Sequence, residues 1–211
     1  MYLAPKLSHM VGELRFDWEH GVSTAQAETV PMDPRGLPEH VQHLAIFAEP
    51  YLSLHPRLAQ YLLGSLPIDH RGFSFVDLGS GKGRMLMYAA LLPFARVVGI
   101  ELSEHLCDTA RANIAAFCER NAVARRPEVR RASAHDLSID GPTVFLLFNP
   151  FSGPVLRRTL EAIARHALGG RDKLYVVYAG PPGNFDDYWS VLQESFVVRE
   201  VLLTPIFGHS Y

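Results

Sequence analysis

The chain has 211 residues, of which 48% are apolar and 20% charged, so it can bury one sizeable core. Twenty Lys and Arg against 22 Asp and Glu leave a formal net charge of -2. This balance excludes a basic protein that coats nucleic acid, because it provides no overall attraction to a polyanion.

The first 45 residues lack clear periodicity. Pro31, Pro34, Gly36 and Pro38 punctuate them, which favours an irregular segment. The first 18 residues contain no apolar stretch of the kind found in secretory signals. Nowhere does an apolar run approach the ~20 residues that cross a bilayer. The sequence therefore predicts a soluble, cytoplasmic protein.

From Leu44 the pattern becomes helical, in two pieces. Pro56 stands where a first-turn proline is tolerated, so we expect a helix at 56–63. From Phe73, short β-branched runs alternate with longer helical ones, which is typical of βα units around a mostly parallel sheet. The expected strands are residues 73–77, 96–100, 129–132, 143–148, 174–178, 196–199 and 201–204. The expected helices are residues 83–92, 104–120, 155–167 and 186–194.

The last two strands are too close in sequence for a parallel crossover, so the C-terminal end of the sheet should be antiparallel. Both cysteines, Cys107 and Cys118, fall inside one expected helix. Eleven residues of helix rise about 16 Å, whereas a disulfide needs Cα atoms within about 7 Å. We therefore expect two reduced thiols.

The most informative stretch is F-V-D-L-G-S-G-K-G-R-M-L, residues 75–86. It leads from an apolar strand through three alternate glycines into a helix. Glycines permit positive φ and carry no Cβ, so a ligand can lie against backbone amides at the start of a helix. A tight turn without a ligand would need only one or two glycines.

Two phosphate-binding motifs do not fit this loop. The dinucleotide fingerprint requires Gly or Ala at position 84, where the chain has Arg84. A P-loop requires four residues before its Gly-Lys pair and then Ser or Thr, but Lys82 is followed by Gly83 and lies too close to Gly79. What remains is D-x-G-x-G-x-G, whose acid suggests a ligand with a positive charge.

With this motif, the chain resembles the class I, Rossmann-like methyltransferases that use S-adenosyl-L-methionine. The resemblance covers residue 73 to the C-terminus. It implies a doubly wound, mostly parallel α/β sheet of seven strands with an antiparallel C-terminal strand. It also implies that residues 73–211 form the cofactor-binding domain and that residues 1–72 form an irregular and helical segment covering the site.

The resemblance also assigns residues to the cofactor. The acid at Asp77 would face its aminoacyl part, Glu101 at the end of the second strand would hold both ribose hydroxyls, and Asp136 would reach the adenine amino group. Without the resemblance, Glu101 would be a surface residue or helix cap, and Asp136 a turn residue. The implied cofactor-binding residues are Asp77, Gly79, Ser80, Gly81, Gly83, Glu101, Leu102 and Asp136.

The fourth strand runs into Asn149, Pro150 and Phe151, at the end of a strand where ligands bind in parallel sheets. This tripeptide looks like a shortened N-P-P-[YF] motif of amino- and amide-directed methyltransferases. The resemblance implies that Asn149 accepts hydrogens from a substrate nitrogen while Phe151 packs on the substrate. One proline of the motif is missing. The alternative is a turn that ends the strand, with Phe151 in the core.

The chain further resembles a group of small bacterial methyltransferases with V-D-L-G-S-G-K-G-R and F-N-P-F motifs, and the non-SET lysine methyltransferases. In the latter, residues before the first strand fold over the cofactor. By this resemblance Tyr51 and Glu49 are candidates to close the site. Tyr178 and His135 are further candidates to line it.

The remaining charged and histidine clusters suggest less. His40 and His43 have helical spacing but no third ligand follows, so no metal site is expected. A basic cluster is either a solvated surface or an attraction for an acidic substrate; it comprises Arg125, Arg126, Arg130 and Arg131. Acidic residues in the N-terminal segment would instead favour a basic substrate; they are Glu13, Asp17, Glu19 and Glu28.

The sequence therefore predicts an enzyme that moves a methyl group from S-adenosyl-L-methionine to a nitrogen or oxygen nucleophile. The acceptor is expected to be a protein lysine or a small-molecule amine. One alternative is a catalytically inactive cofactor-binding partner subunit. Another is a nucleic-acid N-methyltransferase, which the charge balance disfavours.

Overall fold

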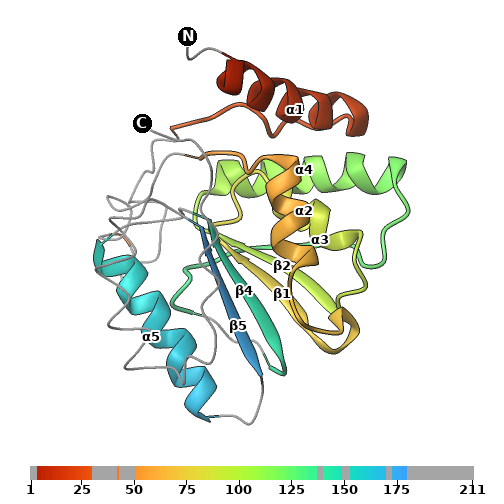
Figure 1. Cartoon of the computed structure of the whole chain (residues 1–211). Coiled ribbons are helices and arrows are strands. Elements are labelled where there is room, and N and C mark those ends of the chain that lie inside the picture. The colour runs from red at the N-terminus through yellow and green to blue at the C-terminus, as the bar shows by residue number, and fades with distance from the viewer. Residues whose placement is uncertain are drawn as a thin grey trace.

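A computed structural model describes residues 4–29, 42, 51–136, 140–148, 153–169 and 173–179. Within these ranges the chain forms a Rossmann-like α/β fold around one parallel sheet (Figure 1). The predicted helix at 186–194 and the predicted strands at 196–199 and 201–204 lie outside the described residues. The predicted sixth and seventh strands therefore remain predictions.

Five strands make up the described sheet, in the order β3-β2-β1-β4-β5, and every pair is parallel. Their bounds are β1 Ser74–Leu78, β2 Arg96–Glu101, β3 Glu128–Arg131, β4 Thr143–Phe148 and β5 Leu174–Ala179. Each strand was predicted to within one residue at either end. All of β1 and nearly all of β2 and β4 are buried, because helices cover both faces, which explains their continuous apolar runs.

Helices lie on both sides of the sheet (Figure 1). Apolar residues of α5, Gly153–Gly169, pack against one face, where they meet Val76, Val98 and Phe145. The opposite face carries α2, Pro56–Gly64, and α3, Arg84–Ala90, with α4, Glu104–Arg120, beside them. A short 3₁₀ turn, His70–Gly72, leads into β1.

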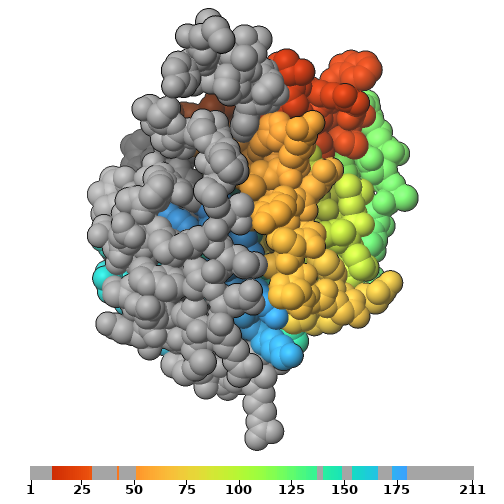
Figure 2. Space-filling view, viewed as in Figure 1, coloured from red at the N-terminus to blue at the C-terminus, as the bar shows by residue number. Residues whose placement is uncertain are grey.

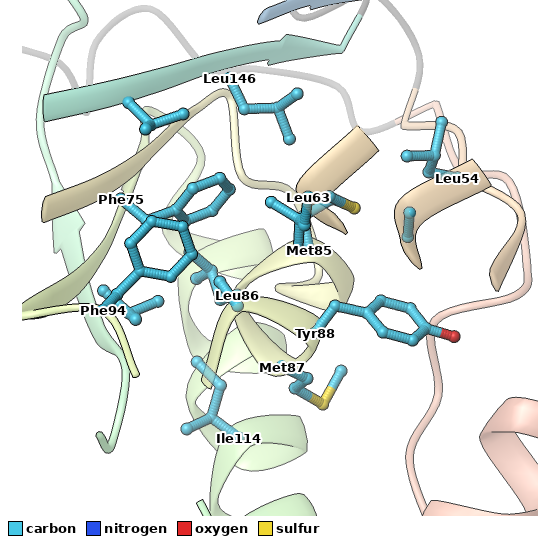
Figure 3. Close-up of a cluster of buried hydrophobic side chains, with 14 of the residues drawn as sticks. Leu54, Leu63, Phe75, Met85, Leu86, Met87, Tyr88, Phe94, Ile114 and Leu146 are labelled. Carbon is cyan, nitrogen blue, oxygen red and sulfur yellow. The ribbon is translucent and has the colours of Figure 1, made fainter. Parts of the chain in front are cut away.

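The larger of the two cores lies beneath α2 and α3. Phe75 and Leu146 from the sheet meet Leu86 of α3 and Leu63 of α2 there (Figure 3). Local signals explain the helix starts. Ser103 accepts a hydrogen bond from the backbone N–H of Leu106 at the start of α4, whose bounds match the prediction.

The expectation of irregular structure is wrong for residues 4–20, which form helix α1, Ala4–His20. Apolar side chains lie on more than one face of this helix. Its sequence therefore does not show the single apolar stripe by which an amphipathic helix is recognised. Phe16 is buried and its ring packs at a tilt against that of Tyr88, whereas Val11, Leu14 and Trp18 are exposed. Figure 2 shows α1 in red beside the orange segment that contains α2, on which it packs.

In the described part of the chain, no helix is long and apolar enough to cross a membrane.

Candidate donor-binding site

Two buried carboxylates mark the carboxyl ends of neighbouring strands. Asp77 in β1 is paired with Gly99 of β2, and Glu101 is the last residue of β2. Side chains alternate along a strand, so both carboxylates share the sheet face of Phe75 and Val97, which pack in the core beneath α3. Asp77 is 4% and Glu101 7% exposed. Burying two acids side by side is costly unless something compensates them.

Glu101 ties the glycine loop to β2. Its Oε2 accepts a hydrogen bond from the backbone N–H of Gly81 at 2.9 Å, and its Oε1 accepts from those of Leu102 at 2.9 Å and Ser103 at 2.8 Å. Burial raises the pKa of Glu101, and these three bonds oppose that rise. The carboxylate thus fixes the loop across the end of β2.

Asp77 has no such partner. Its carboxyl group receives no hydrogen bond from any residue in the described ranges, and burial together with the nearby Glu101 raises its pKa to about 8. No basic side chain of the described chain pairs with Asp77 or Glu101. The two acids therefore have no positively charged side chain as a partner within the described ranges.

The glycine loop adopts a backbone that ordinary residues avoid. Gly79, Gly81 and Gly83 have φ of 79°, 52° and 83°, in the left-handed region. The N–H groups of Gly79 and Ser80 both donate to the carbonyl of Ile100, at 2.8 and 3.1 Å. The loop is therefore held against β2 by backbone bonds as well as by Glu101.

The side chain of Ser80 lies beneath this loop. Its hydroxyl is buried, and among the described residues it has no hydrogen-bond partner. A Cβ on Gly99 would lie 2.6 Å from that oxygen and 2.5 Å from Leu86 Cδ1, so position 99 needs glycine. Ser80 therefore points toward β2.

Two basic side chains near the loop point elsewhere: those of Lys82 in the loop and of Arg84, the first residue of α3. The Lys82 ammonium lies 2.8 Å from Glu28, and the Arg84 guanidinium lies 3.0 Å from Asp17. Both partners precede the domain in the sequence. A phosphate site would turn these cations toward the ligand, so their direction agrees with the earlier exclusion of phosphate motifs.

Comparison with known proteins gives this arrangement a family. Residues 75–169 match the family model described as "Methyltransferase domain". Over these residues the chain is similar to the class I S-adenosylmethionine-dependent methyltransferases. The matched range includes the glycine loop, Asp77 and Glu101.

One curated relative is the ribosomal protein L11 methyltransferase of Aeromonas hydrophila subsp. hydrophila. It is 31% identical over 116 residues, which are 55% of this chain and 37% of the relative. This chain thus spans little more than a third of the length of the curated relative that it matches.

Solved structures share the methyltransferase fold. The precorrin-6y C5,15-methyltransferase of Geobacter metallireducens has a TM-score of 0.51 and 18% identity, over 68% of this chain and 72% of that one. The tRNA (m1A58) methyltransferase of Aquifex aeolicus has a TM-score of 0.51 and 13% identity, over 67% and 53%. At these identities the likeness shows the fold alone.

Tyr51 lies against the glycine loop. A Cβ on Gly81 would be 2.6 Å from Tyr51 Cε2 and closer still to Cδ2. The hydroxyl of Tyr51 donates to the carbonyl of Thr24 at 2.8 Å, and burial raises its pKa well above the usual range. Tyr51 therefore presents a neutral ring to the loop. Glu49 lies outside the described residues.

The other predicted site residues that the structure describes are Asp136, His135 and Tyr178. Asp136 is exposed in the turn after β3, two residues beyond the buried Ala134. His135 lies with Nδ1 3.0 Å from the Ser133 hydroxyl. Tyr178 is half-buried in β5 and packs with the core on the α5 side of the sheet.

The predicted substrate residues Asn149, Pro150 and Phe151 lie outside the described residues. The strand that leads to them is described, however. β4 pairs with β1, with Leu146 opposite Asp77, and β4 ends at Phe148. Since the two strands are parallel, β4 ends at the same edge of the sheet as the glycine loop begins.

Several residues of the two charged clusters are paired with opposite charges. Arg130 bonds Glu128 at 2.9 Å, and Arg131 bonds Glu104 at 2.8 Å, which reduces the positive charge at that edge. In the N-terminal segment Asp17 and Glu28 are engaged by the loop cations. Neither cluster therefore favours a charged substrate as strongly as its sequence suggested.

Both cysteines are free, and burial raises the pKa of Cys107 to about 12, so it is an unreactive thiol. The described ranges contain no group of three or more His, Cys, Asp or Glu side chains that could hold a metal ion. Sequence reasoning missed the roles of Asp17, Lys82 and Arg84. The charges were visible, but nothing local indicates that they meet.

Proposed function

We propose that this protein transfers a methyl group from S-adenosyl-L-methionine to a nitrogen or oxygen nucleophile. The observation that carries the proposal is that the buried acids Asp77 and Glu101 have no cationic partner among the described residues, beside a glycine loop whose own cations point away. This acidic pair suits a donor with a sulfonium and an ammonium group, because a nearby cation would favour the ionised form of both acids. When bound, that cofactor would supply an already activated methyl group.

The residues of the donor site would follow the family pattern. Asp77 would face the aminoacyl part and Glu101 the ribose, beside backbone amides of the loop. The proposed set is Asp77, Gly79, Ser80, Gly81, Gly83, Glu101, Leu102 and Asp136. In this division residues 73–211 are the methyltransferase domain and residues 1–72 the segment covering its site. Leu102 would contribute as the backbone donor that orients Glu101.

The acceptor would be held after β4. Asn149 would accept hydrogens from the substrate nitrogen, Pro150 would fix the turn and Phe151 would pack on the substrate. Holding a nucleophile in line with the methyl group is the main requirement of such a transfer. A lysine acceptor would also have to lose a proton, since its ordinary pKa is about 10.4. We therefore propose a protein lysine or a small-molecule amine as acceptor.

Calorimetry with S-adenosylhomocysteine tests the donor assignment. We expect saturable binding to the folded chain with one site. Incubation of the chain with labelled donor and a broad lysate, followed by mass spectrometry, should then reveal a methylated product. Absence of binding at millimolar ligand would contradict the proposed function. Binding without transfer to any lysate component would instead indicate an inactive cofactor-binding subunit.

Asn149→Ala tests the acceptor assignment. Losing one or two hydrogen bonds worth about 1–1.5 kcal/mol each should lower kcat/KM for the acceptor roughly 10- to 100-fold. Affinity for S-adenosylhomocysteine should change far less, because the donor is held by other strands. An equal fall in both quantities would show that Asn149 only ends a strand.

A further inference from the structure

Lys82 and Arg84 are buried cations whose partners all lie outside the matched domain. Their side chains are 5% and 2% exposed. Among the described residues, every partner of these two side chains belongs to residues 13–28 or 51–54, which we call the N-terminal clasp. Buried charges are tolerated only when paired and hydrogen-bonded. The glycine loop therefore depends on the clasp for its own charge balance.

Arg84 is held from several directions. Its Nε donates to the Thr24 hydroxyl at 2.6 Å, one terminal nitrogen donates to the Leu54 carbonyl at 3.3 Å, and the other reaches Asp17 at 3.0 Å. Asp17 also accepts bonds from the backbone N–H groups of Thr24 and Ala25, at 2.6 and 2.7 Å. Asp17 thus joins α1, the turn after it and the loop cation.

Lys82 binds the clasp at a different point from Arg84. Its ammonium lies 2.8 Å from Glu28 and 5.0 Å from the centre of the Tyr51 ring. Glu28 and Tyr51 exchange two backbone hydrogen bonds, of 3.1 and 2.8 Å. One cation therefore holds both segments against the loop, and with them the ring that lies on Gly81.

We propose that Asp17 and Glu28 are positioning residues for the methyl donor. Acting through Arg84 and Lys82, they hold the glycine loop and Tyr51 in the arrangement to which the donor binds. This inference rests on the proposed function. It means that residues 75–169, although they match the family, do not contain a complete donor site.

Glu28→Gln and Asp17→Asn test the inference, because each removes a counter-charge with little change of shape. Removing one partner of a buried pair leaves an uncompensated charge, so the loop should shift. We expect each variant to bind S-adenosylhomocysteine at least about tenfold more weakly, which is 1.4 kcal/mol at 25 °C. Calorimetry should be done well below the unfolding temperature, with folding verified by circular dichroism.

Glu19→Gln is the matched control. Glu19 is also a carboxylate of α1 with a basic partner, but its ion pair with Arg15 lies at the surface. Its loss should leave donor affinity unchanged. A merely structural pair would lower the unfolding temperature of Glu28→Gln and leave the affinity of the folded protein intact, which would overturn the inference.

A variant that fails to fold, or a wild type that does not bind the ligand, also decides between the proposals. Should Asp17→Asn fail to fold, Glu28→Gln carries the test, because Glu28 is 34% exposed and its loss is milder. Failure of Glu28→Gln to fold would count against the inference, since the pair would then serve stability. A wild-type chain that binds no S-adenosylhomocysteine would contradict the proposed function itself, whereas equal binding by wild type and both variants would contradict only the positioning role.

Discussion

Asp77→Asn is expected to weaken donor binding by about 30- to 5000-fold at pH 8. Asparagine keeps the shape of the side chain and removes its negative charge. Losing one partner of a buried charge pair costs about 2–5 kcal/mol, which gives this range. The measurement is calorimetric titration of the wild type and the variant with S-adenosyl-L-methionine. Affinity within a few-fold of wild type would contradict the assignment of Asp77 to the cationic donor.

The pH dependence of the same titration separates charge from shape. With a pKa of about 8, Asp77 is mostly protonated at pH 6 in the free protein, and a cationic ligand must displace that proton. Wild-type affinity should therefore rise between pH 6 and 8. The amino group of the ligand also titrates near 7.7–8.0, but equally for both proteins. The ratio of wild-type to variant affinity should thus increase with pH.

Stability should respond in the opposite direction. The pKa of Asp77 rises on folding from 3.8 to about 8, so between these values the folded protein keeps a proton that the unfolded chain has lost. Stability consequently falls as pH rises through this window. Asp77→Asn has no such proton to lose. In urea unfolding without ligand, the variant should match wild type near pH 4 and exceed it at pH 8, and a constant difference would contradict the raised pKa.

Local patterns predicted the five described strands and the glycine loop. The run from Phe75 to Leu86 combines an apolar strand, alternating glycines and a helix start, and each feature depends only on neighbouring residues. Glu101 was singled out by the family resemblance, and its spacing from Asp77 is consistent with a βαβ unit. The predicted range of helix α4 equals its observed bounds, and in the structure Ser103 caps its start.

The clasp could not be predicted in this way. Arg84 served only to exclude a dinucleotide fingerprint, because its partner Asp17 lies 67 residues earlier. Similarly, the Lys82 ammonium donates a hydrogen bond to the carbonyl of Gln26, which lies 56 residues earlier. Such pairings depend on how α1 packs on the domain, and α1 itself was missed since its apolar residues face two ways. Buried ion pairs between residues that are far apart in the sequence produce no periodic pattern by which they could be predicted.

Gly81→Ala is expected to disturb both the loop and the clasp. An L-residue at a φ of 52° costs about 1–2 kcal/mol, and the new Cβ would overlap the Tyr51 ring, for which overpacking costs about 1–3 kcal/mol more. We expect the free energy of unfolding to fall by about 2–5 kcal/mol. The shifted N–H of Gly81 would also weaken its bond to Glu101, so donor affinity should fall as well. Urea unfolding and calorimetry measure the two effects.

Two companion variants identify the cause. Gly64→Ala is the control, because Gly64 ends α2 with nothing within 4 Å of a new Cβ, so stability should stay equal or rise by up to about 1 kcal/mol. The second companion is Tyr51→Ala, combined with Gly81→Ala. If the ring is what the new Cβ meets, Gly81→Ala should cost about 1–3 kcal/mol less in the Tyr51→Ala background, leaving the strain of φ. Simple additivity of the two changes would show that Tyr51 does not rest on the loop.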